Sequence, residues 1–442
     1  MAWRSWLHAA LRHPEEPRVL LLRSDRAWRL PRVLVREPVW PAAADTIVAA
    51  FERRLGTRPW LLRQVRYEED EAARRVAGVF ELELRDAGWR PPAHGRWVGR
   101  DELAGMRLAD ESQRELLDGH LAERAAPPER PPWAQPGWLD GVRAWIDEEA
   151  GRLGHRVLAL EQVKHWSISS VLRVVTNGPE LYFKVAARLP LFGDEAVVTA
   201  RLAERFPGYA PKPLAVEPEQ NWLLLSAFAE LFRMRTTPLD TKREFFRRFA
   251  GLQRRSVEFA PQLLAEGCLD RRLEVLEGQL EPLVHDAEAV ARLERSERRR
   301  LRGLVPTFGE ACRRLAGFGI PPALVHGDLH YGNVTRSAGN LVYFDWSDAC
   351  LAHPFIDLFS LQWERKQHQA ALVDAYLEPW EDLAPRERLI EAVELARVVI
   401  PLHHAVSYAT IVGALEPTAK VELDATHVFL REAVARADTA SS

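Results

Sequence analysis

The chain has 442 residues, of which 47% are apolar and 28% charged, with a formal net charge of -3. This is the composition of an ordinary globular protein, and two or three domains are expected at this length. The small net charge gives no electrostatic case for a nucleic acid or an anionic membrane as partner. Three widely spaced cysteines (Cys268, Cys312, Cys350) exclude a disulfide scaffold, so we expect a cytoplasmic protein. Residues 1–12 do not resemble a signal peptide, and no apolar run approaches membrane-spanning length.

Residues 1–124 are predicted to form a small α/β domain. Strands are expected over 18–23, 32–36, 61–67 and 76–84, and helices over 43–55 and 110–123. Segment 49–56 faintly resembles the helix of the Nudix hydrolase signature. Ala50, Arg53 and Arg54 stand where that family has metal-binding glutamates, and arginine cannot ligate magnesium. The resemblance implies a degenerate Nudix-like fold without that catalysis; an unrelated α/β accessory domain is the alternative.

A proline-dense stretch separates this domain from the rest of the chain. Residues 125–137 read AAPPERPPWAQPG, which cannot continue a helix and predicts a semi-rigid linker. We expect a leading helix (138–153) and β-rich lobe over 138–228, a helical lobe over 229–437 and a disordered tail over 438–442. Strands of the β-rich lobe are expected at 158–163, 171–176, 181–185, 211–214 and 222–225. Helices of the last lobe are expected at 240–254, 263–279, 287–318 with a break at Pro306, 358–377, 385–414 and 427–437.

One short segment carries the polar residues of a catalytic site. An apolar run leads into HGDLHYGN (326–333), and a second run over 341–344 delivers Asp345. A carboxylate, a carboxamide about five residues later and a second carboxylate at a strand end are the set that phosphoryl transfer from ATP needs. In such a set one aspartate takes the proton of the acceptor hydroxyl. The asparagine and the other aspartate hold Mg²⁺ against the phosphates.

Two other interpretations of this segment remain open. His326 and His330 are four residues apart and, with Asp328 and His353, could ligate the metal of a hydrolase. The glycine-rich, turn-like segment argues against the helix that such i,i+4 ligation uses. The segment could also be structural, or belong to a nucleotide-binding regulatory module without catalysis, because Asp and Asn are common in turns.

Together the two segments resemble the catalytic signature of the aminoglycoside phosphotransferase and choline kinase-like family, relatives of the protein kinases. The resemblance extends over about 155–437 and implies an α+β, bilobal, protein-kinase-like fold. It also implies transfer of the γ-phosphate of ATP, with Mg²⁺, to a hydroxyl of a small molecule. The chain departs from the family at Ala352-His353-Pro354, where Gly-Asp-Pro is usual, which puts the local loop conformation in doubt.

The resemblance assigns a role to each polar residue of the signature. Asp328 is the catalytic base, and Asn333 and Asp345 are the magnesium ligands. The supporting residues are His326, His330 and Asp357, the last being the buried aspartate that braces the catalytic loop.

Lys184 is the candidate phosphate-binding lysine. It lies in an apolar strand, where a charge is costly unless it is paired. A kinase pairs this lysine with a glutamate on the next helix, for which Glu195 is the candidate and Glu204 the alternative. A surface lysine on an edge strand is the competing interpretation. Residues 165–170 stand where a kinase has its glycine-rich phosphate loop; they include no glycine, and the candidate phosphate contacts there are Ser169 and Ser170.

The acceptor is expected to be a small hydroxylated molecule. About eleven residues separate Asp345 from Asp357, which leaves no room for the docking platform on which protein kinases hold their substrates. The late helices offer a candidate acceptor wall, although such a stripe is more often a satisfied helix face. Its residues are Trp363, Glu391, Glu394, His403, His404 and Tyr408.

Overall fold

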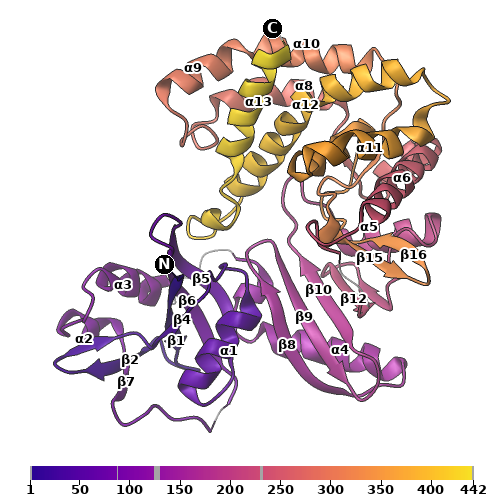
Figure 1. The fold of residues 1–442 in the computed structure, drawn as a ribbon. Coiled ribbons are helices and arrows are strands. Elements are labelled where there is room, and N and C mark those ends of the chain that lie inside the picture. Colours follow the sequence, from indigo (N-terminus) through magenta and orange to yellow (C-terminus); the bar gives the residue numbers. More distant parts are fainter. Residues whose placement is uncertain (1, 87, 124–129, 229–231, 441–442) are drawn as a thin grey trace. The chain divides into compact units, whose positions relative to one another are not determined.

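The computed structural model describes residues 2–86, 88–123, 130–228 and 232–440, and the predicted α+β class is confirmed (Figure 1). The chain divides into two compact units, which are described one at a time. The first comprises Met1–Ala187 with Glu416–Glu422, and the second Arg188–Leu415 with Leu423–Ser442. These units do not follow the predicted domain limits at 124, 137 and 228, which stay a prediction.

The first sheet of the first unit is built around its N-terminal strand, β1 (Arg4–Arg12). This strand pairs in parallel with β6 (Arg75–Leu84) and antiparallel with β2 (Val19–Ser24) and β4 (Arg32–Val35). We did not predict it, because Arg4, His8 and Arg12 interrupt its apolar residues. The remaining strands are β3 (Ala27–Arg29), β5 (Pro59–Asp70) and β7 (Gly95–Val98).

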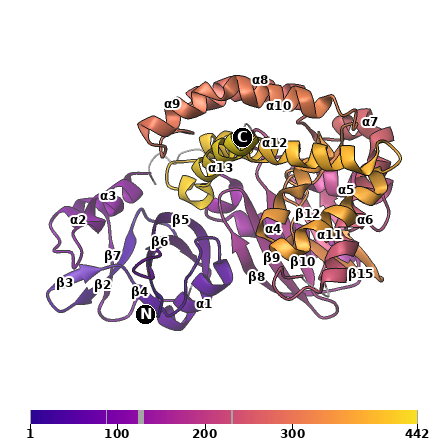
Figure 2. The same cartoon turned by 45° about the horizontal axis from the view of Figure 1, so that its top comes forward.

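Both faces of this sheet are covered. Leu7 and Leu11 of β1 pack with α1 (Ala44–Leu55) in one apolar cluster. Ala10, on the opposite face, packs with α2 (Arg100–Ala104) and α3 (Gln113–Glu123) in another. Helices α1 and α3 therefore lie on opposite faces, as Figure 2 shows, and the predicted α/β layering of this region is present.

The second sheet of this unit carries Lys184. Strands β8 (Val157–His165), β9 (Ser169–Thr176) and β10 (Leu181–Ala186) pair antiparallel in chain order. Helix α4 (Trp138–Arg152) covers one face, where Trp138 and Trp145 lie 6.1 and 5.9 Å from the ring of Phe183. Because strand side chains alternate, the neighbouring Lys184 points to the other face.

The two sheets of the first unit are joined by buried hydrogen bonds. The Gln162 side chain accepts from Leu61 N at 2.8 Å and donates to Leu61 O at 2.7 Å. Its amide therefore forms with the Leu61 backbone the two hydrogen bonds that a neighbouring strand would form. Trp133 of η1 (Pro132–Ala134) is buried and donates to Trp166 O at 2.7 Å. The described part of the predicted linker, 130–137, is therefore packed against the unit; residues 125–129 lie outside the described residues.

The second unit is mainly helical around short strands. Strand β17 (Cys350–Ala352) pairs in parallel with β13 (Leu269–Asp270) and antiparallel with β14 (Ala323–Val325). Two hairpins are formed by β11 (Ala215–Glu217) with β12 (Trp222–Ser226), and by β15 (Val334–Ser337) with β16 (Asn340–Tyr343). The helices are α5 (Glu195–Arg205), α6 (Leu239–Ser256), α7 (Ala260–Ala265), α8 (Leu273–His285), α9 (Arg295–Gly303), α10 (Val305–Ala316), α11 (Lys366–Leu377), α12 (Arg386–Gly413) and α13 (Thr426–Ala440).

Several predicted elements of this unit are corrected. The strand expected at 211–214 is wrong: Pro211 and Pro213 cannot donate to a ladder, and β11 begins only after them. The helix expected over 263–279 is broken by Gly267 at φ +104° and by β13. The helix expected over 287–318 begins at α9, and it divides at Leu304 so that Pro306 falls in the first turn of α10.

Two further expectations about the last helices are also corrected. The expected tail, 438–442, is wrong in its first residues, because α13 runs to Ala440 and Asp438 pairs with Arg300 at 2.5 Å. Among the described residues α12 is long and apolar enough to span a membrane, contrary to our expectation for the sequence. Because 67% of its most apolar window is buried, that composition is what a core helix requires.

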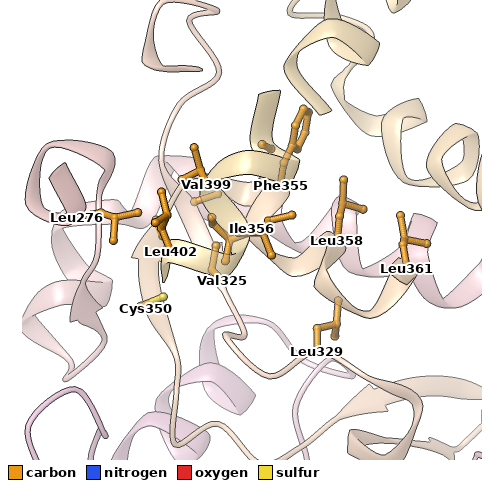
Figure 3. Packing of buried hydrophobic residues seen from close by; sticks show 14 of the residues in the cluster. Leu276, Val325, Leu329, Cys350, Phe355, Ile356, Leu358, Leu361, Val399 and Leu402 are labelled. Carbon is orange, nitrogen blue, oxygen red and sulfur yellow. The ribbon is translucent and has the colours of Figure 1, made fainter. Parts of the chain in front are cut away.

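The core of the second unit includes apolar residues of segment 323–334, which carries the candidate base Asp328 and is called the catalytic segment below. Figure 3 shows Val325 and Leu329 from that segment packed with Ile356 and Leu358 from η4 (Pro354–Trp363). Val399 and Leu402 of α12 enclose the same cluster. The catalytic segment is therefore anchored by apolar side chains on both sides of its polar residues.

Gln162→Ala should destabilise the protein by about 2 kcal/mol, because it leaves the buried N–H and C=O of Leu61 without partners. Urea unfolding would measure this change. Gln135→Ala is the matched control, since Gln135 is exposed and its side chain donates to Arg130 O at 3.1 Å rather than to a buried group. Equal losses in the two variants would contradict the proposed role of Gln162.

Candidate active site

The buried carboxylate of Asp357 holds the start of the catalytic loop. It is 1% exposed and accepts from His326 N at 2.9 Å and Gly327 N at 3.0 Å. Gln253 Nε2 of α6 donates to the same carboxylate at 2.9 Å. Because η4 supplies the aspartate and β14 leads into the loop, this side chain fixes the loop backbone to the core.

A second layer of polar groups orients Gln253. Its Nε2 also donates to Pro354 O at 3.2 Å, and its Oε1 contacts the Tyr376 hydroxyl of α11. That hydroxyl lies 2.7 Å from Pro354 O. The sequence analysis missed Gln253 and Tyr376, because no local pattern marks a helix residue whose partners lie about a hundred positions away.

Gly327 is required for both its conformation and its size. Its φ is +82°, in the left-handed region that favours glycine. A Cβ atom there would lie 2.6 Å from Asp348 O and 2.7 Å from Asp348 Cβ. The close approach of these two segments brings the loop that carries Asp328 beside the one that carries Asp345.

His326 acts as a hydrogen-bonded link between those segments. Its Nε2 lies 3.0 Å from Phe344 O, and its Nδ1 accepts from Asp328 N at 3.3 Å. Burial lowers the pKa of His326, so the ring is neutral and Nε2 carries the hydrogen. With both ring nitrogens bonded to the chain, His326 is not available as a ligand in the metallohydrolase interpretation.

Asp328 and Asn333 lie on one loop and Asp345 on its neighbour, close enough for the charge of Asp345 to act on Asp328. Asn333 Nδ2 donates to Asp328 O at 3.0 Å and to Asp328 Oδ2 at 3.1 Å, which leaves Asn333 Oδ1 for another partner. Phe344 N donates to Asn333 O at 3.0 Å, so the residue before Asp345 is tied to Asn333. Asp345 itself has φ +69°, a conformation that is rare for a residue with a side chain.

Glu195 is linked to Asp345 through the hydroxyl of Ser347. It is buried at the start of α5, and its Oε2 lies 2.8 Å from Ser347 Oγ. The same hydroxyl lies 3.4 Å from Asp345 Oδ1. The alternative, Glu204, is exposed and pairs with Arg201 at 3.2 Å. Lys184 belongs to the first unit, so its pairing with Glu195 stays a prediction.

The predicted phosphate-contact serines are engaged within their own loop. Ser169 Oγ accepts from Trp166 Nε1 at 2.7 Å, and Ser170 Oγ lies 2.9 Å from His165 Nδ1. Ser167, which we did not single out, precedes them in the turn between β8 and β9.

A family model described as the phosphotransferase enzyme family matches residues 160–390. The chain belongs to this phosphotransferase family. No curated protein matches the chain. The match begins after the N-terminal region, so the Nudix-like resemblance of segment 49–56 is not confirmed and stays a prediction.

Solved structures of other phosphotransferases are similar at low identity. Choline kinase LicA from Streptococcus pneumoniae is 15% identical, with 68% of this chain and 99% of that chain covered and a TM-score of 0.47. Macrolide 2'-phosphotransferase MphH from Brachybacterium faecium is 17% identical (64% and 97% covered, TM-score 0.45). Spectinomycin phosphotransferase APH(9)-Ia, solved with ADP and spectinomycin, is 12% identical (67% and 98% covered, TM-score 0.43). At these TM-scores the similarities carry no conclusion about substrate.

The electrostatics of this phosphotransferase keep Asp328 ionised. Burial raises the pKa of Asp328, but the hydrogen bond and charge of His330 outweigh burial, and the pKa lies below its usual value. His330 Nε2 is 3.4 Å from Asp328 Oδ2, while its Nδ1 accepts from Gly332 N at 2.9 Å. An ionised carboxylate is the form that can accept a proton.

The residues of the predicted acceptor wall lie in three different environments. The His404 ring lies 4.0 Å from Phe359 and 5.3 Å from Phe429, and Tyr408 and Trp363 join this aromatic cluster. Glu391 and Glu394 point instead to an exposed helix face, where their partners are Arg388 at 2.8 Å and Arg397 at 3.4 Å. His403 is buried, and its carbonyl accepts from Arg271 at 3.0 Å.

Asp357→Asn should flatten the pH dependence of stability. Burial raises the pKa of Asp357 to about 7, so folding takes up a proton between about pH 4 and this value. The contribution of this group to the free energy of unfolding is present below about pH 4 and is lost as the pH rises through about 7. The difference amounts to roughly 1.4 kcal/mol per pH unit.

Urea unfolding of wild type and variant at about pH 5 and about pH 8 measures this effect. Every other titrating group is common to the two proteins and cancels. Asp382→Asn, an exposed carboxylate paired with Arg254 at 2.5 Å, is the control. Equal pH slopes in wild type and Asp357→Asn would contradict the assignment.

Proposed function

We propose that this protein transfers the γ-phosphate of ATP, with Mg²⁺, to a hydroxyl of a small molecule. The observation that carries the proposal is one group of side chains: Asp328 and Asn333 share a hydrogen bond on a loop fixed by Asp357, and the charge of Asp345, from the neighbouring loop, acts on Asp328. It supplies an ionised carboxylate together with an amide and a carboxylate oxygen. Oxygen atoms are the ligands that Mg²⁺ prefers, so the donor set fits this ion.

In this proposal Asp328 accepts the proton of the acceptor hydroxyl. The hydroxyl oxygen forms a bond to the γ-phosphorus while the bond to the β-phosphate oxygen breaks, and ADP leaves. Asn333 and Asp345 would hold Mg²⁺, which when bound offsets the negative charge of the phosphates. Lys184 is proposed to bind the phosphates and Glu195 to pair with this lysine, as the family resemblance implies.

The acceptor is proposed to be a small hydroxylated molecule with an apolar face. The charge of Asp328 acts on both His404 and Tyr408, so these two residues of the aromatic cluster lie near the proposed base. Residues 346–356 separate Asp345 from Asp357, and all of them are buried except Asp348. The chain therefore offers no exposed platform at this point for a protein substrate.

We also propose a cytoplasmic location, where ATP and Mg²⁺ are available. All three cysteines are free and buried, as in proteins of a reducing compartment.

Asp328→Asn should lower turnover by about two or more orders of magnitude, since a general base contributes roughly 10²–10⁴. A coupled assay of ADP release over a set of sugars, amino alcohols, hydroxy amino acids and aminoglycosides measures it. Asp382→Asn, far from the loop in sequence and exposed, should retain full turnover. If wild type turns over no small molecule but phosphorylates proteins, the proposed acceptor class is wrong.

Asp345→Ala should abolish the magnesium dependence of nucleotide binding, because it removes a charged ligand while Asn333 remains. Calorimetry with ATP in the presence of Mg²⁺ or of a chelator separates the metal-dependent part of the affinity. Equal affinities in wild type and Asp345→Ala would refute the metal assignment. Affinity retained in Asp328→Asn together with lost turnover would distinguish the base from the ligands.

A further inference from the structure

The tip of the loop between β8 and β9 is bonded to a carboxylate from the far end of the chain. Ser167 donates its backbone N–H at 2.8 Å and its hydroxyl at 2.5 Å to the same oxygen, Oε2, of Glu422. Both residues belong to the first unit. Because Ser169 and Ser170 use their hydroxyls inside the loop, Ser167 is the serine whose two donors converge on an anion.

Glu422 is held there without a positive partner. In the part of the chain that the structure describes, no lysine or arginine forms an ion pair with it, and its hydrogen bonds come from Ser167 alone. Burial raises the pKa of Glu422 to about 7, the two bonds from Ser167 lower it, and the nearby charge of Glu416 raises it further. Neutral donors alone hold this carboxylate, so a phosphate, which brings more negative charge and more acceptor oxygens to the same two donors, can displace it.

The segment that carries Glu422 is fixed independently of this contact. Residues 416–422 connect α12 to α13, and Glu416 pairs with Arg130 at 2.8 Å. Gln64 Nε2, on β5 of the N-terminal sheet, donates to Thr418 O at 3.0 Å. The N-terminal region therefore presents the carboxylate to Ser167 at a high effective concentration.

We propose that Glu422 occupies the donors of Ser167 that would otherwise bind a nucleotide phosphate, and that nucleotide binding must displace it. Backbone N–H groups and serine hydroxyls bind phosphate oxygens as they bind a carboxylate. Glu422 is thus a determinant of nucleotide affinity, and the N-terminal region acts on the site by holding segment 416–422. This inference rests on the proposed function, which puts the phosphates of ATP at this loop.

Calorimetric titration with magnesium and a non-hydrolysable ATP analogue tests the proposal on the full chain. At about pH 8, where Glu422 is ionised, Glu422→Gln keeps the shape of the side chain but removes its charge, so nucleotide should bind about tenfold more tightly, the difference between a charged and a neutral acceptor. Glu161→Gln is the matched control. It removes a carboxylate from β8 that pairs with Arg173 at 2.9 Å rather than with the loop, and its affinity should stay within about twofold of wild type.

Hydrogen exchange gives a second measurement that needs no variant. Saturation of wild type with the analogue should speed exchange at the end of this segment, over 420–422, because Glu422 is released while Glu416 and Thr418 stay held by Arg130 and Gln64. Unchanged or weaker nucleotide affinity in Glu422→Gln, or unchanged exchange in this segment, would overturn the role of Glu422 while leaving the proposed function intact. Absence of nucleotide binding by wild type and by every variant would overturn both proposals.

Discussion

The buried carboxylate of Asp357 accepts three N–H donors, two from the backbone of the catalytic loop and one from Gln253. Removing a carboxylate from water is costly, and these bonds are what make the burial tolerable. They also hold the loop in a conformation that includes Gly327 at φ +82°. The chemistry proposed for Asp328 therefore depends on a residue that need not touch any substrate.

The departure from the usual family sequence before this aspartate has a physical explanation. His353 stands where the family usually has an acidic residue, and its Nδ1 accepts from Phe355 N at 3.3 Å at the start of η4. Burial lowers the pKa of His353 to about 3, so the ring stays neutral in the core. The neutral His353 ring thus caps η4, the element that delivers Asp357.

The local part of the site could be predicted from the sequence, and its long-range part could not. Asp328, Asn333 and Asp345 lie within one short stretch, where spacing limits what their side chains can reach. Gln253 and Glu422 could not be found in this way, because their partners, Asp357 and Ser167, lie in distant segments of the chain. Strand β1 was missed for another reason: its polar residues alternate with buried ones in a sheet whose two faces are both covered.

The central claim is that the loop fixed by Asp357 directs a phosphoryl group from ATP to an alcohol. Incubation with ATP labelled with heavy oxygen in its γ-phosphoryl group, Mg²⁺ and a mixture of hydroxylated small molecules, followed by mass spectrometry, tests it most directly. We predict one class of alcohol that gains a labelled phosphoryl group, with an unlabelled bridging oxygen from the acceptor. Label recovered only as inorganic phosphate, or only on protein, would contradict the account.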